Sequence, residues 1–125
     1  ANAASFTRFI PANQRELERL EQMLTYLNTH FDSVVSLQEL ADQVHLSREV
    51  CCRLFRKMTG KTVTQYLEEY RAIQSLSLVE SGQYSMTQIA DLVGFSNASR
   101  FAAAFRRQFG CNPGEYNSRK QQERR

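Results

Sequence analysis

One segment of the chain, residues 48–57, gathers side chains that could read a nucleic-acid base. Glu49, Cys52 and Arg53 fall within about one helical turn, so they would share one face of a helix. A guanidinium there can donate two parallel hydrogen bonds to guanine O6 and N7, and a carboxylate can accept one from cytosine N4. We favour base contact over plain solvation for Arg53. For Glu49, stabilisation of the helix's first turn by its negative charge is an equally good explanation.

A second segment, residues 97–107, contains no acidic residue. Asn97, Ser99 and Arg100 are its candidates for contact with bases. The alanines between them can touch only thymine methyl groups or let the backbone approach closely; these are Ala98, Ala102 and Ala103. We therefore expect this segment to read shape and backbone, and the first segment to carry most of the sequence choice.

Further cations in both segments are candidates for phosphate contact. In the first segment they are Arg48, Arg56 and Lys57, and in the second they are Arg106 and Arg107. No acid lies beside the first group on its own helix after position 50, which favours phosphate over simple solvation. Phosphate contact would fix the register of the protein on a duplex without reading its sequence.

The elements that position these side chains are helices with marked starts. Capping-box spacing, in which an acid or amide follows the cap by three residues, occurs at Asn13, Ser36, Thr62, Ser85 and Asn112. The backbone N–H groups at the last four of these starts could also hold phosphates, although simple capping is the preferred interpretation. Gly60, Gly82 and Gly110 are typical helix stops. The expected helices span roughly 13–30, 36–44, 47–58, 62–81, 85–93, 97–108 and 112–122, an all-α fold with no sheet.

Two parts of the chain repeat each other. Leu40-Ala41-Asp42 matches Ile89-Ala90-Asp91 at an offset of 49, and Phe55-Arg56 matches Phe105-Arg106 at an offset of 50. Each copy reads as a short helix with a small residue at the crossing point, a tight turn and a second helix. The turn favours a residue that tolerates positive φ, a role that Gly94 fills and His45 does not. The pattern predicts two tandem helix-turn-helix units.

Charge and composition narrow the class of protein. The chain of 125 residues has a net charge of +3, but residues 1–47 hold three Lys/Arg against six Asp/Glu, whereas residues 48–125 hold 13 against seven. This asymmetry indicates a polyanionic partner for the basic part. Three cysteines, two of them adjacent, make a poor disulfide framework and favour a reducing, cytoplasmic compartment. No membrane span or signal peptide is expected.

Catalysis is poorly supported. The histidines, His30 and His45, have no Cys, Asp or Glu at a spacing typical of metal ligands, and Cys51-Cys52 is not a CxxC motif. No glycine-rich phosphate loop is present, so we expect no enzyme, no metal and no cofactor. A redox switch at Cys52 is a competing hypothesis, although an incidental thiol is favoured there. A basic module that binds an acidic protein is a further hypothesis.

The second copy resembles the DNA-binding region of the AraC/XylS family of bacterial transcription regulators. The match rests on Ile89-Ala90, Val93-Gly94-Phe95, Phe101, Phe105-Arg106, Phe109-Gly110, Pro113 and Tyr116. Arg100, where the family usually has an aromatic residue, departs from it. The resemblance implies a monomeric reader of double-stranded DNA, often an activator that contacts RNA polymerase. It also implies a separate effector-binding or dimerisation domain, and a location at the nucleoid.

The expected organisation follows from these units. Residues 1–12 would be a linker or a remnant, 13–61 the first helix-turn-helix subdomain, 62–81 a linking helix, 82–118 the second subdomain and 119–125 a basic tail. A helix over 62–81 would be about 30 Å long, close to the ~34 Å turn of B-DNA. A broad apolar stripe along it includes Ile73. We expect the helices 48–58 and 97–108 to read two adjacent major-groove segments that form a direct repeat.

Overall fold

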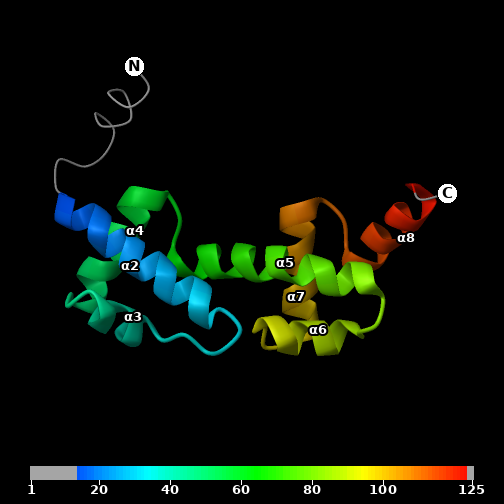
Figure 1. Ribbon diagram of the computed structural model, residues 1–125, viewed down its shortest axis with the longest axis horizontal. Coiled ribbons are helices and arrows are strands. Elements are labelled where there is room, and N and C mark those ends of the chain that lie inside the picture. The colour runs from blue at the N-terminus through cyan, green and yellow to red at the C-terminus, as the bar shows by residue number, and fades with distance from the viewer. Residues whose placement is uncertain (1–13, 124–125) are drawn as a thin grey trace, which may run out of the picture. The chain divides into compact units, whose positions relative to one another are not determined.

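The structure, a computed structural model, describes residues 14–123, and every regular element in that part of the chain is an α-helix (Figure 1). The helices are α2 (Gln14–His30), α3 (Leu37–Gln43), α4 (Arg48–Thr59), α5 (Val63–Ser81), α6 (Met86–Val93), α7 (Ala98–Phe109) and α8 (Pro113–Glu123). The all-α prediction with seven helices is confirmed for these residues, and the boundaries agree to within a residue or two. The expected linker 1–12, the cap Asn13 and the last two residues of the basic tail lie outside the described residues.

Side-chain caps explain why the helices begin where they do. The Ser85 hydroxyl accepts from the Gln88 N–H at 3.1 Å while the Gln88 carboxamide accepts from the Ser85 N–H at 2.8 Å, which completes a capping box. At Ser36 only the first half of the box forms, because the Glu39 carboxylate accepts a hydrogen bond from the Tyr26 hydroxyl. Each cap satisfies an N–H group that has no partner inside its helix.

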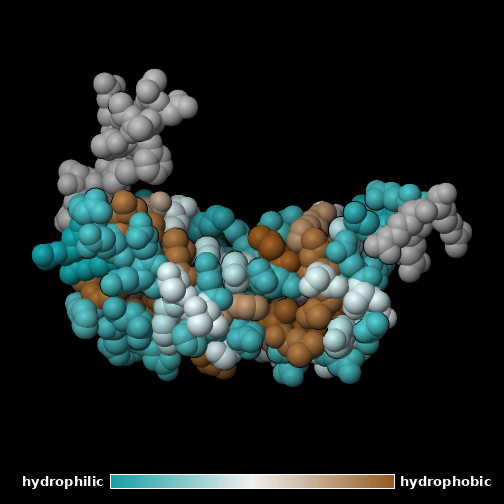
Figure 2. Space-filling view, in the orientation of Figure 1, coloured by the Kyte–Doolittle hydropathy of each residue, from teal (hydrophilic) through white to brown (hydrophobic). Residues whose placement is uncertain are grey.

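The helices form two units, each with its own core. The first unit comprises the described residues up to Thr29 together with Val35–Val63. Its α3 packs on α4, and α2 contributes Met23 and Leu27, both without solvent exposure. The other buried apolar residues of this unit are Leu40, Ala41, Val44, Cys51, Leu54, Phe55 and Val63. On the face shown in Figure 2, hydrophilic residues cover most of α2 and α3, as expected when the apolar side chains of these helices are directed inward.

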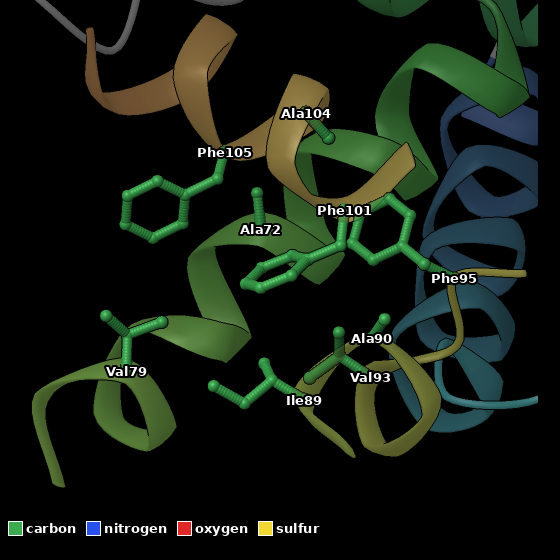
Figure 3. Packing of buried hydrophobic residues seen from close by; sticks show 9 residues of the cluster. All are labelled: Ala72, Val79, Ile89, Ala90, Val93, Phe95, Phe101, Ala104 and Phe105. Carbon is green, nitrogen blue, oxygen red and sulfur yellow. The ribbon is translucent and has the colours of Figure 1, made fainter. Parts of the chain in front are cut away.

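The second unit comprises His30–Val34 and residues from Thr64 onward. Figure 3 shows its core, in which Phe101 and Phe105 of α7 lie between α5 and α6. Their rings meet at a centroid distance of 5.9 Å and 76°, an edge-on geometry that aromatic pairs favour. Phe105 also contacts Tyr116 of α8 edge-on at 5.8 Å. Burial of the Phe101 and Phe105 side chains, both without solvent exposure, contributes about 2–3 kcal/mol each and holds α7 against its neighbours.

One sequence expectation about α5 needs correction. Its periodicity predicts Ile73 as part of a broad apolar stripe, but the Ile73 side chain is 46% exposed. The buried positions of α5 instead include Ala72, Ser75 and Val79. Ser75 is tolerated in the interior because its hydroxyl donates to the Ala72 carbonyl at 2.6 Å. Ala72 and Val79 belong to the core cluster of the second unit, together with Phe101 and Phe105 of α7.

Candidate nucleic-acid interface

Helix α4 presents a polar, cationic face because its opposite face is fixed in the first core. The Ser47 hydroxyl caps the helix by accepting from the Val50 N–H at 3.2 Å. Burial of Cys51, Leu54 and Phe55 then leaves the remaining positions outward. All but one of the predicted contact residues of α4 are exposed, namely Arg48, Glu49, Arg53, Arg56 and Lys57, while Cys52 is half-buried.

A shallow groove beside this face joins α4 to α2. It has a volume of about 240 Å³ and is lined by Glu16, Arg19, Leu46, Val50, Arg53, Leu54 and Lys57. Lys57 Nζ lies 3.3 Å from the Glu16 carboxylate. Sequence reasoning missed this acid, which is 41 residues away from its partner and on another helix. The pair contributes about 0–1 kcal/mol because the Lys57 end is largely exposed, so it leaves the lysine able to exchange partners.

Helix α7 presents the corresponding face of the second unit. Asn97 caps it, since the Asn97 carboxamide oxygen accepts from the Arg100 N–H at 2.8 Å. The cap occupies that oxygen and leaves the Asn97 NH₂ group as the donor for a ligand. Ser99 and Arg100 are exposed on the first turn, and Ala103 is exposed on the next. These predicted contact residues therefore share one end of α7 with the small side chains around them.

The last turn of α7 carries two exposed cations, Arg106 and Arg107. Positive charge is favourable there because it faces the negative end of the helix dipole. Arg107 also donates to the Glu68 carboxylate of α5 at 2.8 Å, with 64% of the arginine side chain exposed. Glu68 is 39 residues away in the chain and was not predicted from the sequence.

Three of the four predicted phosphate-binding helix starts, Ser36, Ser85 and Asn112, are engaged as caps. Ser36 and Ser85 accept hydrogen bonds from backbone N–H groups three residues on, as capping requires. Asn112 accepts from the Glu115 N–H at 2.8 Å and donates to the Glu115 carboxylate at 2.7 Å. Thr62 is half-buried directly before α5. Phosphate contact at these four starts stays a prediction, and it would have to use backbone N–H groups that the caps leave open.

The adjacent cysteines of α4 differ in their surroundings. Cys51 is fully buried, and its thiol lies 3.4 Å from the sulfur of Met23. Burial, with a smaller contribution from the neighbouring Cys52, raises the pKa of the Cys51 thiol to about 11. An uncharged buried thiol of this kind is a packing group rather than a nucleophile.

Two features of the described residues bear on functions besides DNA binding. In that part of the chain, no three or more His, Cys, Asp or Glu side chains gather in a way that could hold a metal ion. None of the helices from α2 to α8 combines the length and apolar character needed to cross a membrane.

Comparison with known proteins decides the family. A family model described as a helix-turn-helix domain matches residues 40–119. The chain belongs to this AraC-type helix-turn-helix family. The match begins at the first residue of the duplicated Leu40-Ala41-Asp42 motif and extends into α8, so it covers both units.

Curated relatives of this AraC-type domain are regulators of transcription. It is 33% identical over 98 residues to an uncharacterized HTH-type transcriptional regulator, YdeC, of Bacillus subtilis. It is 35% identical over 95 residues to the HTH-type transcriptional activator RhaS of Citrobacter koseri. These alignments cover 78% and 76% of the chain, but the chain spans only 34% of either relative's length.

Solved structures share the same fold. The DNA-binding domain of AdpA, a global transcriptional factor solved in complex with a target DNA, matches with a TM-score of 0.76 and 28% identity. The match covers 85% of this chain and 96% of that domain. An AraC-type regulator from Chromobacterium violaceum has a TM-score of 0.74 at 24% identity, covering 85% and 95% of the two chains. The AraC-type chain is thus the DNA-binding domain of a transcription regulator, not an enzyme.

Proposed function

We propose that this domain binds double-stranded DNA sequence-specifically and reads two adjacent major-groove segments, one with α4 and one with α7. The observation that carries the proposal is the pair of exposed, capped second helices, each with its contact residues opposite a buried face. The length of α5 supports it, since 19 residues extend about 28 Å, close to one turn of B-DNA. The two half-sites would then form a direct repeat on one face of the duplex.

In this proposal α4 supplies most of the sequence choice. Arg53 donates two parallel hydrogen bonds from its guanidinium, one to guanine O6 and one to guanine N7, and Cys52 lies against the neighbouring base. Glu49 accepts from cytosine N4 or acts only on the dipole of its own helix, and both roles remain open. Arg48, Arg56 and Lys57 hold phosphates on either side.

The second unit would read shape more than base edges. Asn97, Ser99 and Arg100 reach the groove at the start of α7, and the exposed Ala103 offers no hydrogen bond. Arg106 and Arg107 bind phosphates. Backbone N–H groups near Ser36, Thr62, Ser85 and Asn112 add further phosphate contacts where the caps permit.

The whole protein's role is proposed from its relatives. RhaS is named as an activator, so we propose that the intact regulator activates transcription, contacts RNA polymerase and works at the nucleoid in the cytoplasm. We also propose that the intact regulator carries a separate effector-binding or dimerisation domain, since this chain spans only 34% of either relative's length.

Selection of bound sequences from a random duplex library is the direct test. Two enriched half-sites one helical turn apart support the proposal, with more information in the half-site of α4. If no sequence is enriched and binding depends only on salt concentration, the domain binds DNA nonspecifically through its positive charge, and the proposal is wrong. Equal information in both half-sites would contradict the division of labour between the units.

Variants then separate base contact from charge. Arg53→Ala should cost about 1–3 kcal/mol on the selected site and relax the preference at one base position. Arg53→Lys is the matched control, because it keeps the charge but loses the two-pronged donor and should not restore the preference. Arg106→Ala should weaken binding to all sequences alike and lower the salt slope by about one. If Arg53→Ala also loses affinity equally on every sequence, its assignment to a base is wrong.

A further inference from the structure

A short segment between the first two described helices is bound tightly by the second unit. Arg71 of α5 donates from Nε to the Phe31 carbonyl at 2.7 Å and from Nη2 to the Ser33 carbonyl at 3.1 Å. Phe31 also packs edge-on against Tyr70, with ring centroids 5.2 Å apart. We call residues 31–33 the strap, and its two bonds to Arg71 the clamp. The clamp satisfies two carbonyl groups that follow the end of α2 and have no place in a helix.

The clamp sits in a site built for it. Arg71 is partly buried, and this desolvation lowers its pKa, while the negative charges of Glu68 and Asp32 act in the opposite direction. Removing part of a guanidinium from water is costly unless hydrogen bonds replace the hydration. The Phe31 and Ser33 carbonyls provide that replacement, and the negative charges of Glu68 and Asp32 favour the charged form of the guanidinium.

The turn of the second helix-turn-helix is shaped around the strap. A Cβ atom on Gly94 would lie 2.6 Å from the Phe31 carbonyl oxygen, 2.9 Å from Arg71 Nε and 3.1 Å from Asp32 Cα. No side chain fits at these distances. Gly94 is therefore required for close approach of the strap as well as for its φ of +98°.

The first unit shows that the fold alone does not impose this arrangement. Its equivalent turn holds His45 at φ 57°, with an exposed side chain. Because the His45 side chain is exposed, no segment of the described chain covers this turn as the strap covers Gly94. Among the described residues, the junction of strap, clamp and Gly94 is a feature of the second unit only.

We propose that Arg71 is a positioning residue that couples the two DNA-reading units. The chain leaves the first unit at residue 30, enters the second, and returns at residue 35, with the clamp in the middle of this excursion. The chain therefore passes between the units on both sides of the strap as well as at the boundary between Val63 and Thr64. In this proposal an open clamp makes residues 30–36 a loose linker, and the boundary at Val63 and Thr64 is then the only short connection between the units. This inference rests on the proposed reading of two half-sites.

For DNA binding, the proposal predicts that opening the clamp lowers the avidity that the domain gains by binding both half-sites at once. Linked modules gain avidity through a high effective concentration, which falls when the link loosens. Arg71→Gln should weaken binding to the selected tandem site about tenfold, which is a part of the 10²–10⁴-fold gain that linkage can supply. Binding to a duplex with only one intact half-site should change less than twofold. The penalty for inserting one base pair between half-sites should shrink, because a looser protein tolerates altered spacing.

The experiment measures the binding of four proteins to three duplexes by fluorescence anisotropy. The duplexes are the selected tandem site, a duplex with only one intact half-site, and the tandem site with one base pair inserted between its half-sites. The proteins are the unsubstituted domain, Arg71→Gln, Arg71→Lys, and Gln74→Ala as an exposed control on the same helix. Arg71→Lys keeps the charge but cannot reach both carbonyls in the same way, so it should fall between the unsubstituted domain and Arg71→Gln. Equal losses on the tandem site and the single half-sites, or no loss on the tandem site, would overturn the proposal.

A second measurement does not depend on DNA. Backbone ¹⁵N relaxation gives the rotational correlation time of each unit in the free domain. These times should agree in the unsubstituted domain and in Gln74→Ala, and diverge in Arg71→Gln. If library selection fails while the times diverge, the proposed function is wrong and the coupling is right. If the times stay equal in Arg71→Gln, the coupling is wrong whatever the DNA result.

Discussion

Replacing Gly94 with alanine tests the junction most directly. Placing a residue with a Cβ in the left-handed region costs about 1–2 kcal/mol. The added methyl group would also lie 2.6 Å from the Phe31 carbonyl oxygen and 3.1 Å from Asp32 Cα, which are backbone atoms that cannot swing aside. Overpacking of this kind costs a further 1–3 kcal/mol or so. We therefore expect Gly94→Ala to lower the free energy of unfolding by about 2–5 kcal/mol.

Gly110→Ala provides the matched control within the same unit. Gly110 also ends a helix at positive φ, +81°, but a Cβ there would meet nothing within 4 Å. This variant should lose only the conformational part, about 1–2 kcal/mol. The difference between the two variants then isolates the close approach of the strap from the backbone strain that both share.

Urea unfolding followed by circular dichroism measures both variants, with tyrosine fluorescence as a second probe to detect separate transitions of the two units. The lower midpoint of Gly94→Ala should appear in the transition that reports the second unit. Equal losses in Gly94→Ala and Gly110→Ala would refute the reasoning, because the strap would then make no contribution at Gly94.

Two further substitutions and two measurements on Cys51 follow from the structure. His45→Gly should stabilise the first unit by about 0.5–1 kcal/mol, since relief of positive-φ strain exceeds the entropy that glycine adds to the unfolded chain; a lower urea midpoint would contradict this. Glu68→Gln should release Arg107 for phosphate and strengthen binding to all duplexes while steepening the salt slope by about one; an unchanged slope in titrations would show that the arginine stays unavailable. With its pKa at about 11, the buried Cys51 should resist a thiol reagent at pH 8 while the half-exposed Cys52 reacts, and modification of Cys51 in the native protein would show that the first unit opens. Stability that Cys51 supplies below the ordinary thiol value of 9.0 should fall as the pH rises toward 11, measurable as a declining urea midpoint.

The sequence predicted the elements well because their signals are local. A serine or asparagine three residues before a backbone donor sets a helix start, and the spacing of Phe101, Ala104 and Phe105 sets the buried face of α7. The exposed contact residues of α4 and α7 can be predicted because they occupy the helix positions that do not belong to the buried face. Helical periodicity therefore determines which side chains can reach a ligand without any knowledge of the tertiary structure.

Contacts between distant positions could not be predicted. Glu16 and Glu68 pair with cations 41 and 39 residues away, and nothing in the spacing of one helix reveals an acid on another. Ile73 resembles a core residue because propensity and hydrophobicity are local, whereas the small residues Ala72 and Ser75 take the interior positions. Arg71 could not be recognised for the same reason, since its partners are backbone carbonyls that carry no sequence signal.

The strap gives the domain a nested topology. Residues needed to complete the second unit are synthesised before most of the first unit, so during translation they must wait for α5 to α7 to emerge from the ribosome. The two repeats consequently cannot be exchanged as cassettes. A gene fragment that began at α5 would encode every helix of the second reader, yet it would leave the Arg71 guanidinium and the surface at Gly94 open to water. The second repeat is therefore not autonomous, because an upstream stretch of backbone supplies the acceptors for Arg71 and lies against its turn at Gly94.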